Sequence, residues 1–212
     1  MRRCATSCSR HDPPMIILGL TGSVGMGKST AAREFRRLHI PVHDADKAVH
    51  RLLGRGGQAV AAVAEAFPGV LRDGAIDRAA LGRLVFADPG ALKRLEEILH
   101  PLVRAAERRF LARARRQRRK LVVLDIPLLF ETGGQARCDK VLVVSAPRRI
   151  QLARVMARPG MTAERLAGVE ARQMPDAEKR RRADIVIQTG LGRRHSLARL
   201  RRELRRLQGQ GS

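Results

Sequence analysis

The chain has 212 residues, 44% of them hydrophobic, so it can bury an independent core but is too short for a string of modules. Its 43 Lys and Arg against 20 Asp and Glu give a formal charge of +23, which predicts anionic partners: phosphorylated small molecules, nucleic acid or an acidic membrane surface. Aromatic residues are only 2%, which argues against stacking of single-stranded nucleic acid, and three scattered cysteines exclude a disulfide framework.

Residues 1–14 are polar and lack the apolar segment of a secretory signal. We expect them to be a disordered extension or the product of an early-assigned start, with Met15 as the alternative first residue; their Arg and Ser content also resembles an organelle transit peptide. No stretch approaches the roughly 20 apolar residues that span a bilayer. Together with the cysteine usage, this predicts a cytoplasmic protein without a membrane partner.

The first elements predict the opening of a doubly wound α/β sheet. Residues 16–20 form a short apolar run typical of a buried parallel strand, glycine-rich residues 22–27 follow, and a helical pattern then runs to about Leu38. Residues 40–43 predict a second, weaker strand that ends at Asp44-Ala45-Asp46. Strand, loop, helix and strand in this order are typical of a parallel sheet with crossover helices.

Residues 47–119 predict a helical insertion between two strands of that sheet. Asp77, and Asp88 followed by Pro89, are typical helix N-caps, and His100-Pro101 predicts a further helix start. We find no convincing strand pattern in this segment, so we expect it to be helical throughout.

The strand pattern returns at residues 121–125 and 141–144, both apolar and rich in β-branched residues. Residues 147–157 and 163–174 predict helices on either side of an Arg-rich turn, and residues 184–187 predict a last short strand. A final amphipathic helix is indicated by Leu197, Leu200, Leu204 and Leu207.

Residues 22–29 match the phosphate-binding pattern G-x-x-x-x-G-K-[ST], known as the P-loop, between the first strand and the first helix. Glycines let backbone N–H groups turn toward phosphate oxygens, and the helix N-terminus adds partial positive charge. Lys28 supplies a cation for the β- and γ-phosphates, and the Ser29 hydroxyl is a ligand for Mg²⁺. The alternative is a glycine-rich turn that only caps a helix. The predicted ATP-binding residues are Gly22, Gly25, Met26, Gly27, Lys28, Ser29 and Thr30.

Three carboxylates are expected at the carboxyl edge of the sheet, where doubly wound folds bind their ligands. Asp44 and Asp46 follow the second strand and could accept a proton from an attacking hydroxyl or hold a metal-bound water; capping of a helix by Asp46 is the alternative. Asp125 ends an apolar strand and is either a metal-binding carboxylate of the Walker-B type or the start of a loop at Pro127.

Arg154 and Arg158 are four residues apart on a predicted helix and therefore share one face. Cations over a transferring phosphoryl group stabilise its charge, so the pair predicts a lid; a solvated basic face is the alternative. Two further segments are strongly basic, with nine Lys and Arg in residues 101–120 and seven Arg in residues 193–206. We interpret these as solvated helix faces rather than a nucleic-acid footprint, because neither contains a recognition motif.

The chain resembles the dephospho-CoA kinase family over residues 16 to about 190. The landmarks, in family order, are Leu20-Thr21-Gly22, Asp44-Ala45-Asp46, His100-Pro101, the D-I-P-L-L-F-E stretch at 125–131, Gln151-x-x-Arg154, Arg158, Gln173, Ala183-Asp184 and Ile187. The resemblance implies transfer of the γ-phosphoryl group of ATP to the 3′-hydroxyl of the ribose of dephospho-CoA, with Mg²⁺.

The resemblance also implies a P-loop NTPase-type doubly wound parallel sheet in three parts. These are a nucleotide-binding core at 15–46 and 120–210, a helical CoA-binding insertion at 47–119, and a lid around 150–175. By the same resemblance Asp46 is the favoured base, and Arg154 and Arg158 are the lid arginines. Two alternatives remain at this point: another small P-loop kinase that phosphorylates a nucleoside monophosphate or small alcohol, and a nucleic-acid-binding ATPase that uses the basic helices.

Overall fold

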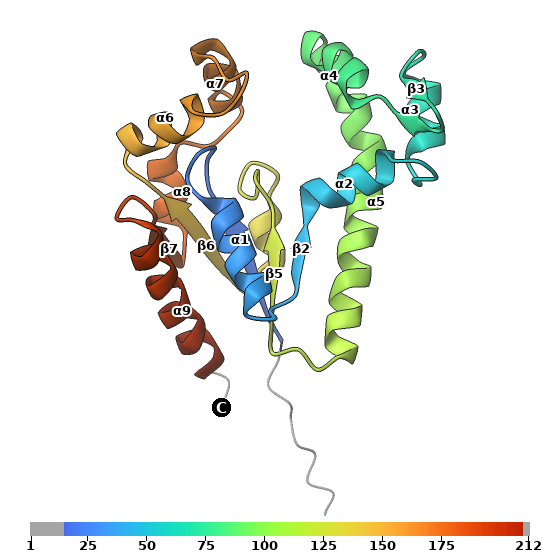
Figure 1. Ribbon diagram of the computed structural model, residues 1–212. Coiled ribbons are helices and arrows are strands. Elements are labelled where there is room, and N and C mark those ends of the chain that lie inside the picture. The colour runs from blue at the N-terminus through green and yellow to red at the C-terminus, as the bar shows by residue number, and fades with distance from the viewer. Residues whose placement is uncertain (1–14, 210–212) are drawn as a thin grey trace, which may run out of the picture.

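The computed structural model describes residues 15–209, which are built around a five-stranded parallel sheet (Figure 1). The prediction for residues 1–14 lies outside the described residues. All four strand pairings in this sheet are parallel, which confirms the predicted α/β class. In spatial order the strands are β2 (Val42–Asp44), β5 (Leu121–Asp125), β1 (Ile16–Thr21), β6 (Lys140–Ser145) and β7 (Ile185–Gln188).

The two faces of the sheet pack against separate apolar clusters. On one face Leu18 and Leu20 of β1 join Phe35 of α1 (Lys28–Arg37) and the buried leucines of α9 (Arg193–Gly209). On the other face Ile17 packs with a cluster that includes Leu111 of α5 (Pro89–Arg116). Successive side chains of a strand point to opposite faces, so an all-apolar strand is buried on both sides. The predicted amphipathic C-terminal helix is confirmed.

A third apolar cluster lies within the insertion between β2 and β5. It is formed by α2 (Ala45–Leu53), α3 (Val60–Ala66), α4 (Arg78–Ala87) and the first half of α5. The predicted N-caps are confirmed, because the Asp77 carboxylate accepts from the N–H groups of Ala79 and Ala80, and that of Asp88 from Gly90.

Residues 71–76 correct the expectation that the insertion is helical throughout. Here β3 (Leu71–Arg72) and β4 (Ala75–Ile76) form a short antiparallel hairpin. Its two turn residues, Asp73 and Gly74, have φ values of 49° and 74°. A two-residue hairpin turn needs left-handed backbone at both positions, and Asp-Gly is a favoured pair for it. Ile76 is buried in the insertion cluster and holds the hairpin to the helices.

The long helix α5 corrects the prediction of a new helix start at His100-Pro101, because it runs unbroken through both residues. A proline inside a helix removes one backbone hydrogen bond and usually ends or kinks it. Here the buried stripe continues on both sides, with Leu95 and Leu99 in the insertion cluster and Leu111 against the sheet. Packing on both flanks therefore decides the path of the helix, and His100 is exposed rather than a cap.

Three helices follow β6: α6 (Arg148–Met156), α7 (Ala163–Glu170) and α8 (Asp176–Arg182), of which α8 was not predicted. Figure 1 shows α6 and α7 on one side and α3 and α4 on the other, both beyond the carboxyl ends of the strands, with the P-loop between them. Within residues 15–209 no helix is long and apolar enough to cross a membrane.

Candidate functional site

A cavity of ≈ 540 Å³ lies between the P-loop, α6 and α9. Its volume is typical of a site for a small ligand. The wall includes most of the residues that the sequence singled out, although they come from segments far apart in the chain. These are Gly22, Gly25, Gly27, Lys28, Ser29, Thr30, Asp46, Arg154 and Arg158. The structure therefore brings the predicted ATP-binding loop, one predicted acid and both predicted lid arginines to one cavity.

The P-loop lies close against its supports. A Cβ atom added at Gly22 would lie 2.5 Å from the Val144 side chain of β6, and one at Gly25 would lie 2.5 Å from the Val155 side chain of α6. Gly25 and Gly27 also have φ values of 78° and 93°, which side chains disfavour. After Gly27 the chain enters α1, whose N-terminal N–H groups are a ready site for an anion.

Lys28 and Asp125 form an ion pair, with Nζ 2.8 Å from Oδ1. Asp125 ends β5 and is buried, whereas Lys28 lies on the cavity wall. Burial raises the pKa of Asp125 above its ordinary value, although the neighbouring ammonium group of Lys28 opposes the shift. Asp125 itself is not part of the wall, so it contacts the cavity through Lys28.

The two acids after β2 have different surroundings. The Asp44 carboxylate caps α2 by accepting from the N–H of Lys47 and pairs with Arg36 at 3.2 Å. The cap is therefore Asp44, not Asp46, which corrects the alternative considered for Asp46. Asp46 is exposed and lines the cavity, and within residues 15–209 no hydrogen bond or ion pair engages its side chain. Of the two acids, Asp46 is the one placed to meet a ligand.

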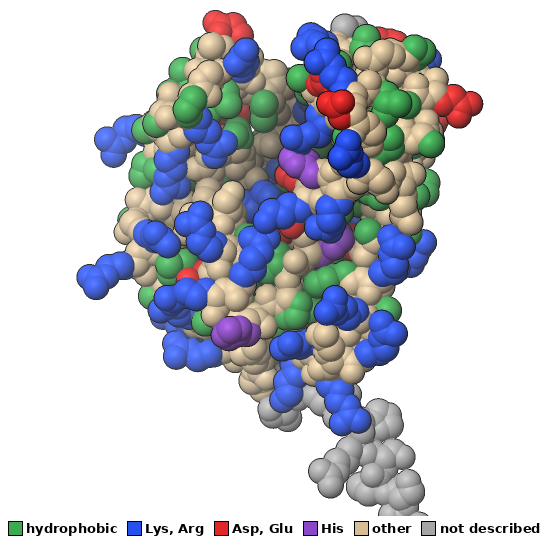
Figure 2. Space-filling model, turned by 45° about the vertical axis from the view of Figure 1, so that its right-hand side comes forward, with side chains coloured by type: hydrophobic (Ala, Val, Ile, Leu, Met, Phe, Trp, Pro, Cys, Tyr) green, Lys and Arg blue, Asp and Glu red, His purple; other side chains and the backbone are tan. Residues whose placement is uncertain are grey.

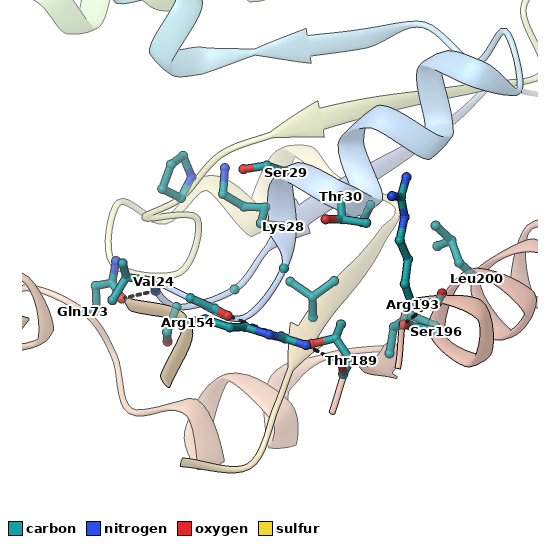
Figure 3. Close-up of a pocket in the computed structure, with 18 of the residues that line it drawn as sticks. Val24, Lys28, Ser29, Thr30, Arg154, Gln173, Thr189, Arg193, Ser196 and Leu200 are labelled. Carbon is teal, nitrogen blue, oxygen red and sulfur yellow. Dashed lines mark hydrogen bonds between the residues drawn. The ribbon is translucent and has the colours of Figure 1, made fainter. Parts of the chain in front are cut away.

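Arg154 lies on α6 beneath the P-loop and is held in place by the residue that follows β7 and by the loop. Its guanidinium group donates to the Thr189 carbonyl at 2.7 Å, to the Thr189 hydroxyl at 2.9 Å and to the Gly25 carbonyl at 3.4 Å (Figure 3). Arg158 lies just beyond the end of α6 rather than on the same helix. Both arginines line the cavity. The guanidinium group of Arg154 is already engaged by its hydrogen bonds to Thr189 and Gly25.

Several wall residues escaped the sequence reasoning. Thr189 follows β7 and donates its hydroxyl proton to the Met26 carbonyl at 2.8 Å, so it joins the P-loop to the last strand. At the end of the cavity beyond Thr30, the α9 residues Arg193, Ser196 and Leu200 complete the wall (Figure 3). Leu197 of the same helix also lines the cavity. The carboxyl ends of parallel strands meet at one edge, so the residue after β7 was identifiable in principle, but the α9 residues carry no local signal.

Met26 was predicted to bind the cofactor, but the structure does not bring it to the cavity wall. Its side chain is buried in the cluster under α1, and its sulfur accepts from the Ala146 N–H at 3.1 Å. Its own N–H donates to the Ser23 carbonyl. Met26 therefore anchors the loop to β6 from behind.

Positive charge is spread widely over the molecule. Figure 2 shows Lys and Arg side chains across the visible face, with a hollow between the two upper parts of the molecule. Part of the charge of α9 is neutralised locally, because Arg201 pairs with the buried Glu34 of α1 and Arg199 with Glu203. This arrangement favours general attraction of anions over one dedicated strip for nucleic acid.

Comparison with known proteins gives a consistent result. The family model for dephospho-CoA kinase matches residues 16–192. A protein from Paramagnetospirillum magneticum named dephospho-CoA kinase is 71% identical over 166 residues, which cover 78% of this chain and 78% of that protein. One of the same name from Rhodospirillum rubrum is 61% identical over 191 residues, covering 89% of this chain and 90% of that protein.

Solved structures agree. A structure from Thermus thermophilus has a TM-score of 0.80 at 40% identity and covers 90% of this chain and 96% of its own. The dephospho-CoA kinase from Campylobacter jejuni has a TM-score of 0.68 at 26% identity, covering 89% and 95%. A shikimate kinase from Acinetobacter baumannii, at 17% identity and a TM-score of 0.51, shares the fold alone. The fold is that of the P-loop kinases.

Proposed function

The chain belongs to the dephospho-CoA kinase family, and from this premise we propose that it transfers the γ-phosphoryl group of ATP to the 3′-hydroxyl of the ribose of dephospho-CoA. The observation that carries the proposal is that Lys28 of the P-loop and the unpaired acid Asp46 line the same cavity. A phosphate-binding cation and a hydroxyl-orienting carboxylate at one cavity are what phosphoryl transfer to an alcohol requires.

On the donor side, the triphosphate lies on the P-loop with Lys28 beside its terminal phosphates. The N–H groups at the start of α1 face the same space and favour negative charge there. The apolar end of the cavity, with Ile187, Leu197 and Leu200, suits a purine base. The cavity thus offers charge at one end and apolar surface at the other, as ATP does.

On the acceptor side, Asp46 lies in the first turn of α2, where the insertion begins. Its carboxylate orients the acceptor hydroxyl and receives its proton as the bond to phosphorus forms. Transfer of a phosphoryl group depends mainly on positioning and charge stabilisation, so Asp46 contributes less than Lys28. Arg158 adds positive charge on the lid side of the phosphates.

The residues present also fit a magnesium ion shared with the nucleotide. Within residues 15–209 no cluster of three His, Cys, Asp or Glu could hold a metal alone. Mg²⁺ in kinases typically takes few protein ligands and completes its shell with water and phosphate oxygens. Ser29, which lines the cavity, would supply a hydroxyl ligand, whereas Asp125 lies off the wall and is paired with Lys28. The bound ion would neutralise charge on the β- and γ-phosphates.

A panel of acceptors tests the function. Purified protein is incubated with ATP, Mg²⁺ and one acceptor: dephospho-CoA, a nucleoside monophosphate or shikimate, and products are identified by mass. We expect phosphorylation of dephospho-CoA with a much higher kcat/KM than of the others, and a kcat about 10²–10³-fold lower with the Lys28→Met variant. Preference for another acceptor would overturn the assignment. ATP hydrolysis stimulated by DNA or RNA, with steeply salt-dependent binding, would instead favour the nucleic-acid alternative.

A further inference from the structure

Two glutamine side chains hold the peptide groups on either side of Val24 in the P-loop. Gln151 of α6 donates from Nε2 to the Val24 carbonyl at 3.0 Å. Gln173, beyond α7, accepts from the Val24 N–H at 3.3 Å (Figure 3). The glutamines lie 127 and 149 residues away from Val24 in the chain. Both adjoining peptide planes are therefore fixed by side chains from the lid segment.

The contact to the Val24 carbonyl also sets the direction of the next N–H group. The Val24 carbonyl and the Gly25 N–H belong to one peptide unit, and in a planar trans peptide they point in opposite directions. Gln151 holds the carbonyl toward α6, so the Gly25 N–H is turned away from α6. Gly25 lines the cavity, and within residues 15–209 no protein atom accepts from its N–H. That N–H is free to donate to a phosphate oxygen.

This peptide unit needs such a restraint because its N–H belongs to a glycine. Gly25 has a φ of 78°, and glycine passes between positive and negative φ with little penalty. A flipped peptide would present the Val24 carbonyl to the phosphates in place of an N–H, which replaces attraction by repulsion. Fixing the peptide before the ligand arrives removes that unfavourable state.

The orientation of Gln151 is itself determined by its neighbours. The side chain is 3% exposed; its Oε1 accepts from Arg148 at 2.8 Å, while its Nε2 also donates to Glu170 at 3.2 Å. Arg148 only donates and the Glu170 carboxylate only accepts, so the amide can be placed in one way. Arg148 and Glu170 pair with each other as well, which joins α6 to α7.

Gln173 is held through the backbone that follows it. The Met174 N–H donates to Glu131 Oε1 at 2.7 Å, and the same oxygen lies 2.9 Å from Nζ of Lys179, which is fully buried. A buried ion pair with a backbone hydrogen bond fixes this joint between α7 and α8. Glu131 thus determines where the Gln173 side chain begins.

We propose that Gln151 and Gln173 are positioning residues for phosphoryl transfer, which hold the Val24–Gly25 turn so that the Gly25 N–H faces the phosphates. Glu131 and Lys179 act one step behind, by placing Gln173. This inference rests on the proposed use of ATP but not on the identity of the acceptor.

The test compares a ligand that has the phosphates with one that lacks them. Gln151→Met keeps the length of the side chain but removes the donor to Val24. Calorimetry measures the affinity of this variant for ADP and for adenosine. Steady-state kinetics measures its kcat and its KM for ATP. We expect ADP affinity to fall about tenfold or more, as for a lost hydrogen bond to a charged group, with adenosine affinity unchanged and kcat lowered. Gln117→Met, at an exposed position after α5, is the matched control.

Gln173→Met carries the same expectation from the other side of the turn and keeps the test available if the Gln151 variant does not fold. Unchanged ADP affinity would overturn the proposal, because the glutamine would then have no effect on phosphate binding. An equal loss of affinity for ADP and adenosine would also overturn it, because that result indicates general damage to the cavity. Neither affinity measurement involves an acceptor, so failure of the dephospho-CoA assignment would leave the ADP and adenosine results interpretable.

Discussion

The guanidinium carbon of Arg172 lies 4.4 Å from the centre of the Phe86 ring. Phe86 belongs to α4 of the insertion and is 67% exposed, whereas Arg172 follows α7 in the lid. Within residues 15–209 no hydrogen bond or salt bridge joins residues 47–119 to residues 148–182, so this cation–π contact is the polar link between the two sides of the crevice.

We expect the contact to favour closure over the acceptor. Phe86→Ala and Arg172→Met should each raise KM for dephospho-CoA about two- to fivefold, and the double variant no further, as an exposed cation–π pair of about 0.5–1 kcal/mol predicts. Strictly additive effects would contradict the coupling. The chain contains no Trp, so Phe86→Trp would give a single fluorophore whose emission reports the contact directly.

Lys28→Met should lower kcat for phosphoryl transfer by about 10²–10³-fold, because it removes a preorganised cation where charge develops. It also leaves the Asp125 carboxylate buried without its ion-pair partner. Lys47→Met, at an exposed position in the first turn of α2, is the control for loss of one positive charge. Near-normal turnover by the Lys28 variant would remove the P-loop from the mechanism.

The two acids after β2 should separate into a functional and a structural residue. Asp46→Ala should lower kcat about ten- to a hundredfold with little change in melting temperature, since its side chain meets the cavity. Asp44→Ala should instead destabilise the protein by about 1 kcal/mol through loss of the α2 cap. Thermal unfolding and single-turnover kinetics on both variants test this distinction. A loss of stability in Asp46→Ala and a loss of kcat in Asp44→Ala would reverse the assignment.

Asp125 should give the folded protein a characteristic pH dependence. Burial raises the pKa of this carboxyl group above its ordinary 3.8, so the folded state binds the proton more tightly than the unfolded state. Its contribution to stability is therefore full below pH 3.8 and is lost as the pH rises through the raised value. The free energy of unfolding of Asp125→Asn, relative to the wild type, should accordingly increase from acid to neutral pH in urea titrations.

Asp184→Asn is the matched control, because its shift has the opposite sign. Burial of Asp184 acts to raise its pKa, but hydrogen bonds from the Val141 N–H and from Lys140, with the charge of Lys140, lower it overall. Stability from Asp184 is present above pH 3.8 and is lost as the pH falls through the lowered value. Relative to the wild type this variant should lose stability toward neutral pH, and equal slopes for both variants would contradict the assignment.

The sequence predicted those parts of the fold whose signals are local. The five strands and the P-loop are short contiguous patterns. The N-caps Asp77 and Asp88 are recognisable from the few residues that follow each of them. The hairpin at residues 71–76 was missed although Asp73-Gly74 is a typical turn pair, because its strands are only two residues long. The continuity of α5 through Pro101 depends on packing at both ends and is invisible in the local pattern.

The site was predictable to the same extent. Lys28 and Ser29 are identified by the motif, and Asp46 by its place after a strand, but nothing local separates Asp46 from Asp44 until Arg36 and the α2 N–H groups are in place. Thr189, Gln151 and the α9 wall act across more than a hundred residues of chain, so only the assembled sheet brings them to the P-loop.

The helix α5 contributes to two apolar clusters: Leu95 and Leu99 belong to the insertion cluster, and Leu111 and Ala114 to the cluster against the sheet. We therefore expect the insertion to open locally while the sheet stays intact, so that its amides exchange with solvent at a lower opening free energy. Because one continuous helix spans both units, a small change in the tilt of α5 at the sheet produces a larger displacement of its N-terminal half in the insertion. Substitutions at Leu111 should therefore change the affinity for the acceptor.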